Sequence, residues 1–230
     1  MELEDQKVKI IEVKEVADFT KSYVLEKPEN FKYLAGDHGY IELSPDNGKP
    51  FSLVSSPHEN LIEFATIIRD SSKWKQELNN KKAGDELILS GPYGKFGYQE
   101  HEKDIVFIAG GIGITPFMSI MRYLTEENKD TKVTLLYSNK TLKRTAFKDE
   151  IDSLANKNDN IKVIYTMTED ESYDGNKGRI DSNFIKENVE NLKEKTWYVA
   201  GPPKMVVVMN SILKEEFKIE NIKLDSFGGY

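Results

Sequence analysis

The chain contains no cysteine among its 230 residues. Without a thiol it cannot form a disulfide, a thiolate zinc site or a cysteine nucleophile, and its own side chains cannot hold an iron–sulfur cluster. Histidine is scarce too, with only His38, His58 and His101, and none has a partner at metal-ligand spacing. We therefore expect no metal site.

Basic residues are in the minority. The 32 Lys and Arg residues stand against 39 Asp and Glu, which gives a net charge of −7. Non-specific binding to nucleic acid requires cations that neutralise phosphates, so this balance argues against it. The apolar fraction is only 38%, but 10% of the residues are aromatic, and this argues against global disorder.

Long apolar segments are missing as well. The longest uncharged run, Ile105 to Met121, is interrupted by three glycines and a proline. A strand, a glycine turn and a helix start explain that run better than a membrane span. The acidic start, Met1 to Asp5, lacks the apolar core of a signal peptide. These absences predict a cytoplasmic protein without a membrane span.

The first hundred residues have the pattern of a small antiparallel β-barrel. Short β-rich runs are separated by turn residues, and one short helix interrupts them near Ser72–Leu78, with Ser71 or Ser72 as its N-cap. The predicted strands are Val8–Val16, Ser22–Leu25, Tyr40–Leu43, Phe51–Val54, Leu61–Ile68 and Glu86–Leu89.

The pattern changes after about Glu102, where buried strands and helices alternate. Such alternation indicates a doubly wound α/β domain with a parallel sheet. Strands are predicted at Ile105–Ala109, Val133–Tyr137, Ile161–Tyr165 and Trp197–Ala200, and helices at Pro116–Leu124, Ala146–Leu154, Asn183–Val189 and Lys204–Phe217. We expect two domains, residues 1–101 and 102–230.

Two glycine-containing turns follow strands of the second domain. The segment 109–116, Ala-Gly-Gly-Ile-Gly-Ile-Thr-Pro, follows its first strand, and 201–205, Gly-Pro-Pro-Lys-Met, follows its last. Glycine lets a backbone approach a phosphate, and a helix start offers free N–H groups to it. Each could instead be a tight turn or a rigid helix start without a ligand. Two such turns at the carboxyl ends of strands in one sheet favour a shared ligand.

Two further segments lie in the first domain. Segment 49–57, Lys-Pro-Phe-Ser-Leu-Val-Ser-Ser-Pro, offers an aromatic face, a small hydroxyl and a cation, although a plain core strand would have the same pattern. Segment 91–96, Gly-Pro-Tyr-Gly-Lys-Phe, is by itself an ordinary turn.

In order and spacing the four segments resemble the ferredoxin–NADP reductase-like flavoprotein superfamily. Its members join an FAD-binding β-barrel to an NADP-binding α/β domain. The family's Gly-Pro-x-Gly-x-Phe and Gly-Gly-x-Gly-x-Thr-Pro motifs match fully at 91–96 and 110–116. Its Arg-x-Tyr-Ser, Tyr-Ser-Asn-Arg and Cys-Gly-Pro-Pro-x-Met motifs match with one or two changes at 49–52, 137–140 and 200–205.

The changes affect the expected site. Lys49 replaces an arginine that grips the flavin pyrophosphate, so the charge is kept and the bidentate fork is lost. Because that phosphate signature is weaker, FMN stays an alternative to FAD. Phe51 replaces a tyrosine, so ring stacking is kept and a phenolic hydrogen bond is lost. Ala200 replaces a cysteine near the nicotinamide, and that thiol carries no hydride itself.

The resemblance implies a set of binding residues. For the flavin these are Lys49, Pro50, Phe51, Ser52, Thr66, Ile67, Ile68, Ser71 and Ser72. For NADP or NAD they are Gly111, Gly113, Thr115, Pro116, Ser138, Lys140, Arg144, Gly201, Pro202 and Met205. An aromatic near the end of the chain would cover the flavin, with Phe227 the first choice and Tyr230 the second; a frayed tail is the alternative. Ser52, Phe227 and Asp225 would serve catalysis, although Asp225 could equally be a solvated carboxylate.

The implied activity is hydride transfer from NAD(P)H to FAD and electron release to an external acceptor such as ferredoxin, flavodoxin or another carrier. A weak preference for NADPH over NADH is expected, because cations that could bind the ribose phosphate follow the second strand of the α/β domain: Lys140, Lys143 and Arg144. The alternative is that these residues form a solvated loop. A basic cluster of Arg69, Lys73, Lys75, Lys81 and Lys82 would dock the acceptor, or is a solvated face. Two other functions stay open: an electron-transfer subunit of a larger haem or metal oxygenase complex, and a non-catalytic flavin- or nucleotide-binding module.

Overall fold

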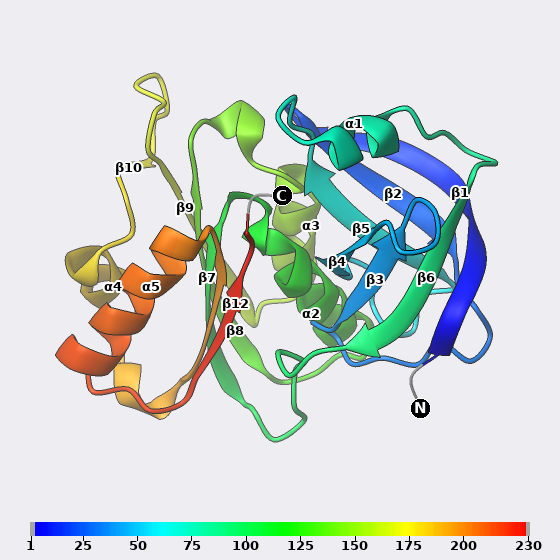
Figure 1. The fold of residues 1–230 in the computed structure, drawn as a ribbon. Coiled ribbons are helices and arrows are strands. Elements are labelled where there is room, and N and C mark those ends of the chain that lie inside the picture. Colours follow the sequence, from blue (N-terminus) through cyan, green and yellow to red (C-terminus); the bar gives the residue numbers. More distant parts are fainter. Residues whose placement is uncertain (1–2, 229–230) are drawn as a thin grey trace.

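The computed structural model describes residues 3–228 and contains two six-stranded sheets, which lie side by side in Figure 1. The first sheet consists of β1 (Leu3–Ala17), β2 (Thr20–Glu26), β3 (His38–Glu42), β4 (Gly48–Ser52), β5 (Leu61–Ile67) and β6 (Glu86–Tyr93). The second consists of β7 (Asp104–Gly110), β8 (Lys132–Asn139), β9 (Ile161–Met167), β10 (Asn176–Lys177), β11 (Thr196–Gly201) and β12 (Ile222–Ser226). The helices are α1 (Lys73–Asn79), α2 (Thr115–Glu126), α3 (Lys148–Lys157), α4 (Ser182–Asn188) and α5 (Pro203–Ser211).

The first sheet is antiparallel and runs in the order β4-β3-β6-β1-β2-β5. Its two edge strands meet where Leu53 bridges Phe64 and the Val54 N–H donates to the Glu63 carbonyl at 2.7 Å. These contacts close the sheet into the predicted barrel. Tyr23, Leu25, Ile41, Leu53 and other apolar side chains fill its interior.

The second sheet is parallel and runs in the order β10-β9-β8-β7-β11-β12. Within this sheet the chain begins with the central strand β7 and adds β8, β9 and β10 on one side. It then crosses over and adds β11 and β12 on the other side of β7. Helices cover both faces, with α2 and α3 on the side of the barrel and α4 and α5 on the opposite side (Figure 1). The sequence prediction of a barrel followed by a doubly wound α/β unit is confirmed.

Local predictions are confirmed at most elements. The short barrel helix is α1, and Ser72 caps it, since its Oγ accepts a hydrogen bond from the Lys75 N–H at 3.4 Å. The last predicted helix is α5 followed by a wider turn, Ile212–Glu216. The end of the chain is not frayed as far as Ser226, because β12 pairs along its length with β11. Within residues 3–228, no helix is both long and apolar enough to cross a bilayer.

The two sheets share one apolar cluster. Side chains of α2 such as Phe117 and Ile120 pack on the parallel sheet, and the same cluster includes Ala65 and Phe96 from the barrel half. Phe96 contacts Phe117 and Tyr198, with ring centroids 5.8 and 5.1 Å apart. The barrel therefore sits on α2, which points its N-terminus at the junction between the two halves.

Candidate functional site

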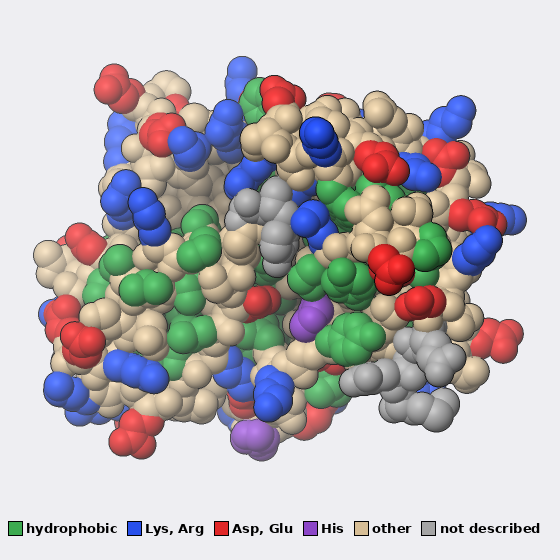
Figure 2. Space-filling view, in the orientation of Figure 1, with side chains coloured by type: hydrophobic (Ala, Val, Ile, Leu, Met, Phe, Trp, Pro, Cys, Tyr) green, Lys and Arg blue, Asp and Glu red, His purple; other side chains and the backbone are tan. Residues whose placement is uncertain are grey.

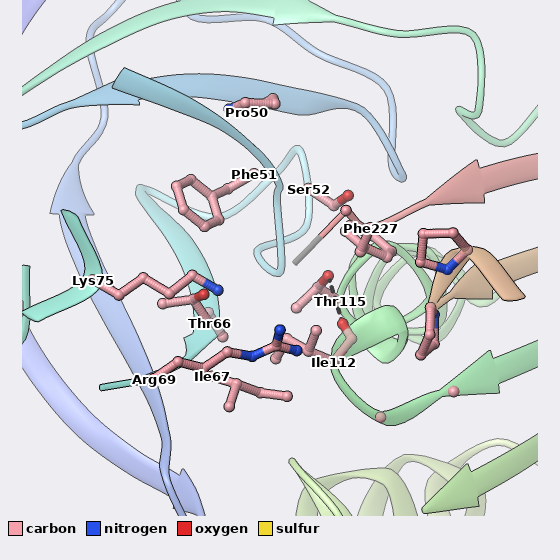
Figure 3. Close-up of a pocket in the computed structure, with 16 residues that line it drawn as sticks. Pro50, Phe51, Ser52, Thr66, Ile67, Arg69, Lys75, Ile112, Thr115 and Phe227 are labelled. Carbon is pink, nitrogen blue, oxygen red and sulfur yellow. Dashed lines mark hydrogen bonds between the residues drawn. The ribbon is translucent and has the colours of Figure 1, made fainter. Parts of the chain in front are cut away.

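A cavity of about 200 Å³ lies at this junction. Residues from both halves line it, and Figure 3 shows their side chains around one space. The lining residues are Pro50, Phe51, Ser52, Ala65, Thr66, Ile67, Arg69, Lys75, Gly110, Gly111, Ile112, Thr115, Pro202, Pro203, Phe227 and Gly228. Segments from separate parts of the sequence thus meet at one place.

The barrel contributes an aromatic wall. Phe51 is 8% exposed, and its ring stacks on Trp74 of α1 with centroids 5.4 Å apart and planes 28° apart. Phe64 also packs against this ring, with centroids 5.0 Å apart. Two neighbours thus fix the orientation of Phe51, and it presents a rigid apolar surface to the cavity.

The α/β half contributes backbone. Gly110 and Gly111 end β7 and begin the 3₁₀ turn Gly111–Ile114, and Thr115 follows at the start of α2. Gly111 has φ = 53° and open space where a Cβ would stand. Gly113 instead packs on β11, since a Cβ there would overlap the Ala200 carbonyl. One glycine leaves the turn open to a ligand, and the other brings two strand ends together.

Phe227 reaches the cavity from the end of β12. Its N–H donates to the Gly201 carbonyl at 3.0 Å, so the backbone is anchored beside Pro202. The ring is partly buried and faces the same space as Phe51 and Thr115 (Figure 3). An aromatic side chain from the α/β half therefore lies across the cavity from the barrel.

A polar cluster stands beside Ser52. The Ser52 hydroxyl donates to Asp225 Oδ2 at 3.3 Å, and His38 pairs with Ser52 in the β3–β4 register. Burial raises the pKa of the Asp225 carboxyl, an effect that His38 and the Ser52 hydroxyl oppose. Burial lowers the pKa of His38, while Asp225 raises it. The sequence alone assigns His38 no role, because nothing local shows that it lies near residue 225.

Basic side chains also line or adjoin the cavity. Lys75 is only 6% exposed, and no carboxylate among residues 3–228 pairs with it. Burial first, and then the charges of Arg69 and Lys49, lower the pKa of Lys75 to about 8. Figure 3 shows Lys75 and Arg69 both extending toward the cavity. A buried cation without a counter-ion is costly, and an anionic ligand would relieve that cost.

These features fit a flavin nucleotide. Phe51, which stacks on Trp74, offers a face for a planar ring, the Ser52 hydroxyl lines the same cavity, and Lys75 and Arg69 offer charge to phosphate. Of the predicted docking cluster, Arg69 and Lys75 line this cavity, Arg69 as an exposed residue and Lys75 as a buried one. The sequence carries one signal for the burial of Lys75, which is helical spacing. Lys75 lies on the face of α1 that also buries Trp74 and Leu78.

Of the predicted site residues, one group lines the cavity: Pro50, Phe51, Ser52, Thr66, Ile67, Gly111, Thr115, Pro202 and Phe227. A second group adjoins these segments without lining it: Lys49, Ile68, Ser71, Ser72, Gly113, Pro116, Met205, Gly201 and Asp225. Ser138, Lys140 and Arg144 lie at and beyond the end of β8. Tyr230 is outside the described residues.

Known proteins are similar to this chain in sequence and in fold. The family of oxidoreductase NAD-binding domains matches residues 107–210. NADH-cytochrome b5 reductase 2 of Mycosarcoma maydis is 31% identical, over 71% of this chain and 50% of its own length. A component of the Na(+)-translocating NADH-quinone reductase of Methylococcus capsulatus is 27% identical, over 93% of this chain and 66% of its own length.

A solved structure has the same fold across both halves. A ferredoxin NADP+ reductase from Neisseria gonorrhoeae with bound FAD and NADP superposes with a TM-score of 0.84 at 18% identity, covering 97% of this chain and 99% of the other. The present chain spans about half the length of the first curated relative it matches. With the barrel, the parallel sheet and the motifs in register, the chain belongs to the ferredoxin–NADP reductase-like superfamily.

Proposed function

We propose that this chain binds FAD in the junction cavity, oxidises NAD(P)H there and passes the electrons to an external acceptor. The observation that carries the proposal is the single cavity shared by Phe51 and Ser52 of the barrel and by the Gly110–Gly111 turn of the α/β half. A hydride can pass only between rings held in contact, and the residues proposed to hold the two rings line the same cavity.

Bound FAD would supply the redox chemistry by accepting a hydride from reduced nicotinamide and releasing electrons to the acceptor. The chain would hold and orient it. Phe51, backed by Trp74 and Phe64, would lie against the flavin ring. Lys75 and Arg69, together with the predicted Lys49, would neutralise the phosphates.

Ser52 would hold a proton at the reacting edge of the ring. Its hydroxyl bonds to Asp225, and the raised pKa of that carboxyl makes it a better proton donor near neutral pH than an exposed aspartate. Burial favours the neutral form of His38, which lies next to Ser52 on the neighbouring strand. Ser52, Asp225 and His38 are the groups of this chain proposed to handle the proton beside the flavin.

The α/β half would hold the nicotinamide nucleotide. The open backbone at Gly111 and the start of α2 at Thr115 would face its pyrophosphate. Phe227 occupies the space between the two halves and would move aside when the nicotinamide ring stacks. NADP or NAD fits this description equally.

The acceptor is proposed as a separate redox carrier, such as ferredoxin, flavodoxin or a haem protein. Relatives named for cytochrome b5 and for quinone support the wider class of acceptors. An electron-transfer subunit inside a larger complex is the second candidate, supported by the relative that is named as a subunit of the Na(+)-translocating NADH-quinone reductase.

The test is to purify the protein, release and identify its flavin, and follow NADH and NADPH oxidation with ferricyanide, ferredoxin, flavodoxin and cytochrome b5. We expect FAD and turnover with at least one nicotinamide and ferricyanide. A protein that binds flavin without oxidising either nicotinamide would be a binding module, and the proposed activity would be wrong.

A further inference from the structure

Strand β12 lies at the edge of the parallel sheet and has little apolar packing of its own. It pairs with β11 on one side, and within residues 3–228 no strand pairs with its other side. None of its five residues is fully buried. Figure 2, in the orientation of Figure 1, shows polar and charged side chains at the surface along the junction where β12 runs. Such a strand depends on a few polar contacts for a fixed position against the barrel.

Alternate residues of β12 and of its continuation are directed to the barrel and the cavity. Because successive side chains of a strand point to opposite faces, Lys223, Asp225 and Phe227 lie on one side. Asp225 accepts a hydrogen bond from the Ser52 hydroxyl, and Phe227 lines the cavity. Lys223 is the member of this row that has no part in the proposed function.

Lys223 joins the two halves of the molecule. Its Nζ donates to the Gly97 carbonyl at 3.1 Å, in the segment that leads from the barrel to β7. The same Nζ lies 2.8 Å from Glu102 Oε1 and donates to Tyr198 Oη of β11 at 2.6 Å. An ammonium group has three protons to donate, so the three acceptors saturate it.

Glu102 gives this contact a fixed base. Its side chain is 2% exposed, and its Oε2 accepts hydrogen bonds from the Tyr198 hydroxyl at 2.5 Å and from the Gln99 N–H at 3.0 Å. The Glu102 carbonyl accepts a further one from the Thr131 hydroxyl at 3.1 Å, just before β8. Burial and the bond to Glu102 raise the pKa of Tyr198, so the tyrosine stays protonated and donates. Lys223 is therefore held by a buried network with its partners in place.

The network is the stronger of the two polar contacts between β12 and the barrel side. The bond from Ser52 to Asp225 is 3.3 Å long, beyond the usual range for an O–H···O bond, whereas the contacts of Lys223 are short and charge-assisted. At about 3.3 Å per residue, Phe227 lies only about 13 Å along the chain from Lys223. A shift of β12 at Lys223 would therefore move Asp225 and Phe227 as well.

We infer that Lys223 is a positioning residue for the reaction. Together with Glu102 it fixes β12 against the barrel, and thereby fixes Asp225 beside the flavin site and Phe227 across it. The inference rests on the proposed function, because it assumes that hydride transfer takes place in the cavity that Phe227 lines. Neither Lys223 nor Glu102 belongs to the motifs shared with the superfamily.

The first test is hydrogen–deuterium exchange of the purified flavin-bound protein, read by mass spectrometry, and it needs no turnover. The variant Lys223→Met/Glu102→Gln removes both charges together, so that neither is left buried alone. Amides of residues 222–227 should exchange about tenfold or more faster than in the wild type, as expected for the loss of a charge-assisted hydrogen bond. Amides of β7 and β8 should keep the wild-type rates.

The second test is stopped-flow reduction of the flavin by NADH and NADPH. The same variant should lower the rate constant of reduction about tenfold, because the reacting groups are less well placed. Lys223→Arg keeps the charge and should restore most of the rate. Lys223→Gln keeps an amide donor and should show both changes at smaller size, which gives a second variant if the double variant folds poorly.

A double-mutant cycle separates positioning from general stability. Sites more than about 10 Å apart without shared partners act additively, so a purely structural role of Lys223 would lower the rate equally in the wild type and in Phe227→Ser. If Lys223 acts through the position of the Phe227 ring, its effect in Phe227→Ser should be at least about threefold smaller.

The matched control is Lys186→Met/Glu216→Gln, which removes an exposed pair of the same charges 2.7 Å apart and should change neither measurement. Wild-type exchange over residues 222–227, faster exchange throughout the parallel sheet, or additive effects with Phe227→Ser would overturn the positioning role and leave the proposed reductase standing. A wild type whose flavin is reduced by neither nicotinamide would overturn both.

Discussion

At the scale of single residues, Lys75 is the clearest sign of a ligand. It is almost fully buried, it has no ion pair within the described chain, and two further cations lie close to it. Burying a lysine charge without a partner does not add to the free energy of unfolding. The burial of Lys75 is therefore best explained by an anion that is present in the working protein.

Replacing this lysine by methionine separates binding from stability. We expect Lys75→Met to weaken flavin affinity by about 10- to 100-fold, because a charge-assisted hydrogen bond to phosphate is worth about 1.5–3 kcal/mol. The flavin-free variant should be more stable than the flavin-free wild type, since an unpaired buried charge is gone. Flavin titration and thermal unfolding measure the two effects. Lys73→Met, exposed on the same helix, should change neither.

The lowered pKa of Lys75, about 8, also sets a pH dependence. The unfolded chain binds a proton at this lysine up to its ordinary pKa of about 10.4, so the stability of the flavin-free protein rises between pH 8 and about 10. Flavin affinity changes in the opposite direction. Phosphate favours the protonated amine, so affinity is highest below pH 8 and falls above it. Flavin titrations at pH 7, 8 and 9 would show this, and Lys75→Met should flatten the profile.

Phe227 lines the cavity, in the space that the nicotinamide ring would enter in the proposed function. We expect Phe227→Ser to change nicotinamide affinity or the rate of hydride transfer, because no aromatic ring then competes for that space. Stopped-flow flavin reduction at several NADH concentrations separates the two quantities. Leu224→Ser, at an exposed position of the same strand, is the control. If both quantities stay at wild-type values in Phe227→Ser, Phe227 does not cover the flavin.

At the scale of helices and strands, the sequence predicts those structural features that depend on residues close together in the chain. Alternating apolar residues indicated the barrel strands, and the glycine segment 110–116 indicated a strand end, a turn and a helix start. The strand β12 was not predicted, since its five half-exposed residues take their structure from pairing with β11. The ion pair between Lys140 and Glu169 was hidden for the same reason: it depends on the register of β8 and β9, which joins residues distant in the chain.

The glycine turn gives a prediction with an internal control. In Gly113→Ala, a Cβ would overlap the Ala200 carbonyl and force the 3₁₀ turn away from β11, which we expect to cost about 2–4 kcal/mol of unfolding free energy. Gly111→Ala meets no atom and should cost only about 1 kcal/mol for its positive φ. Urea denaturation measures both. Equal losses would mean that close packing at Gly113 is not what the turn requires.

At the scale of the whole molecule, the cavity exists only if the two halves keep one relative position. An ionic cluster on Arg122 of α2 helps to fix it. The Arg122 Nη1 lies 2.7 Å from Glu63 Oε2 of β5, and its Nε lies 2.6 Å from Glu150 Oε1 of α3. The Ser119 hydroxyl of the same helix donates to the Ser55 carbonyl at 2.6 Å. Helix α2 therefore has the turn proposed to bind the nicotinamide nucleotide at its start and the barrel contacts along its length.

Arg122→Met should test whether this cluster holds the halves together. The side chain is 11% exposed, so its removal takes the cation away from the buried Glu63 and from the partly exposed Glu59 and Glu150, and we expect a loss of about 3–5 kcal/mol in unfolding free energy at pH 8. The loss should be smaller at pH 5 than at pH 8, because burial raises the pKa of Glu59 and so favours its protonated form as the pH falls. Urea denaturation at both pH values, followed by far-UV circular dichroism and by tryptophan fluorescence, measures the loss and shows whether the halves unfold together.

Lys186→Met, which breaks the exposed pair with Glu216, should cost at most about 0.5 kcal/mol. A loss for Arg122→Met no larger than that control, with no dependence on pH, would mean that the shared apolar cluster alone positions the barrel on the α/β half.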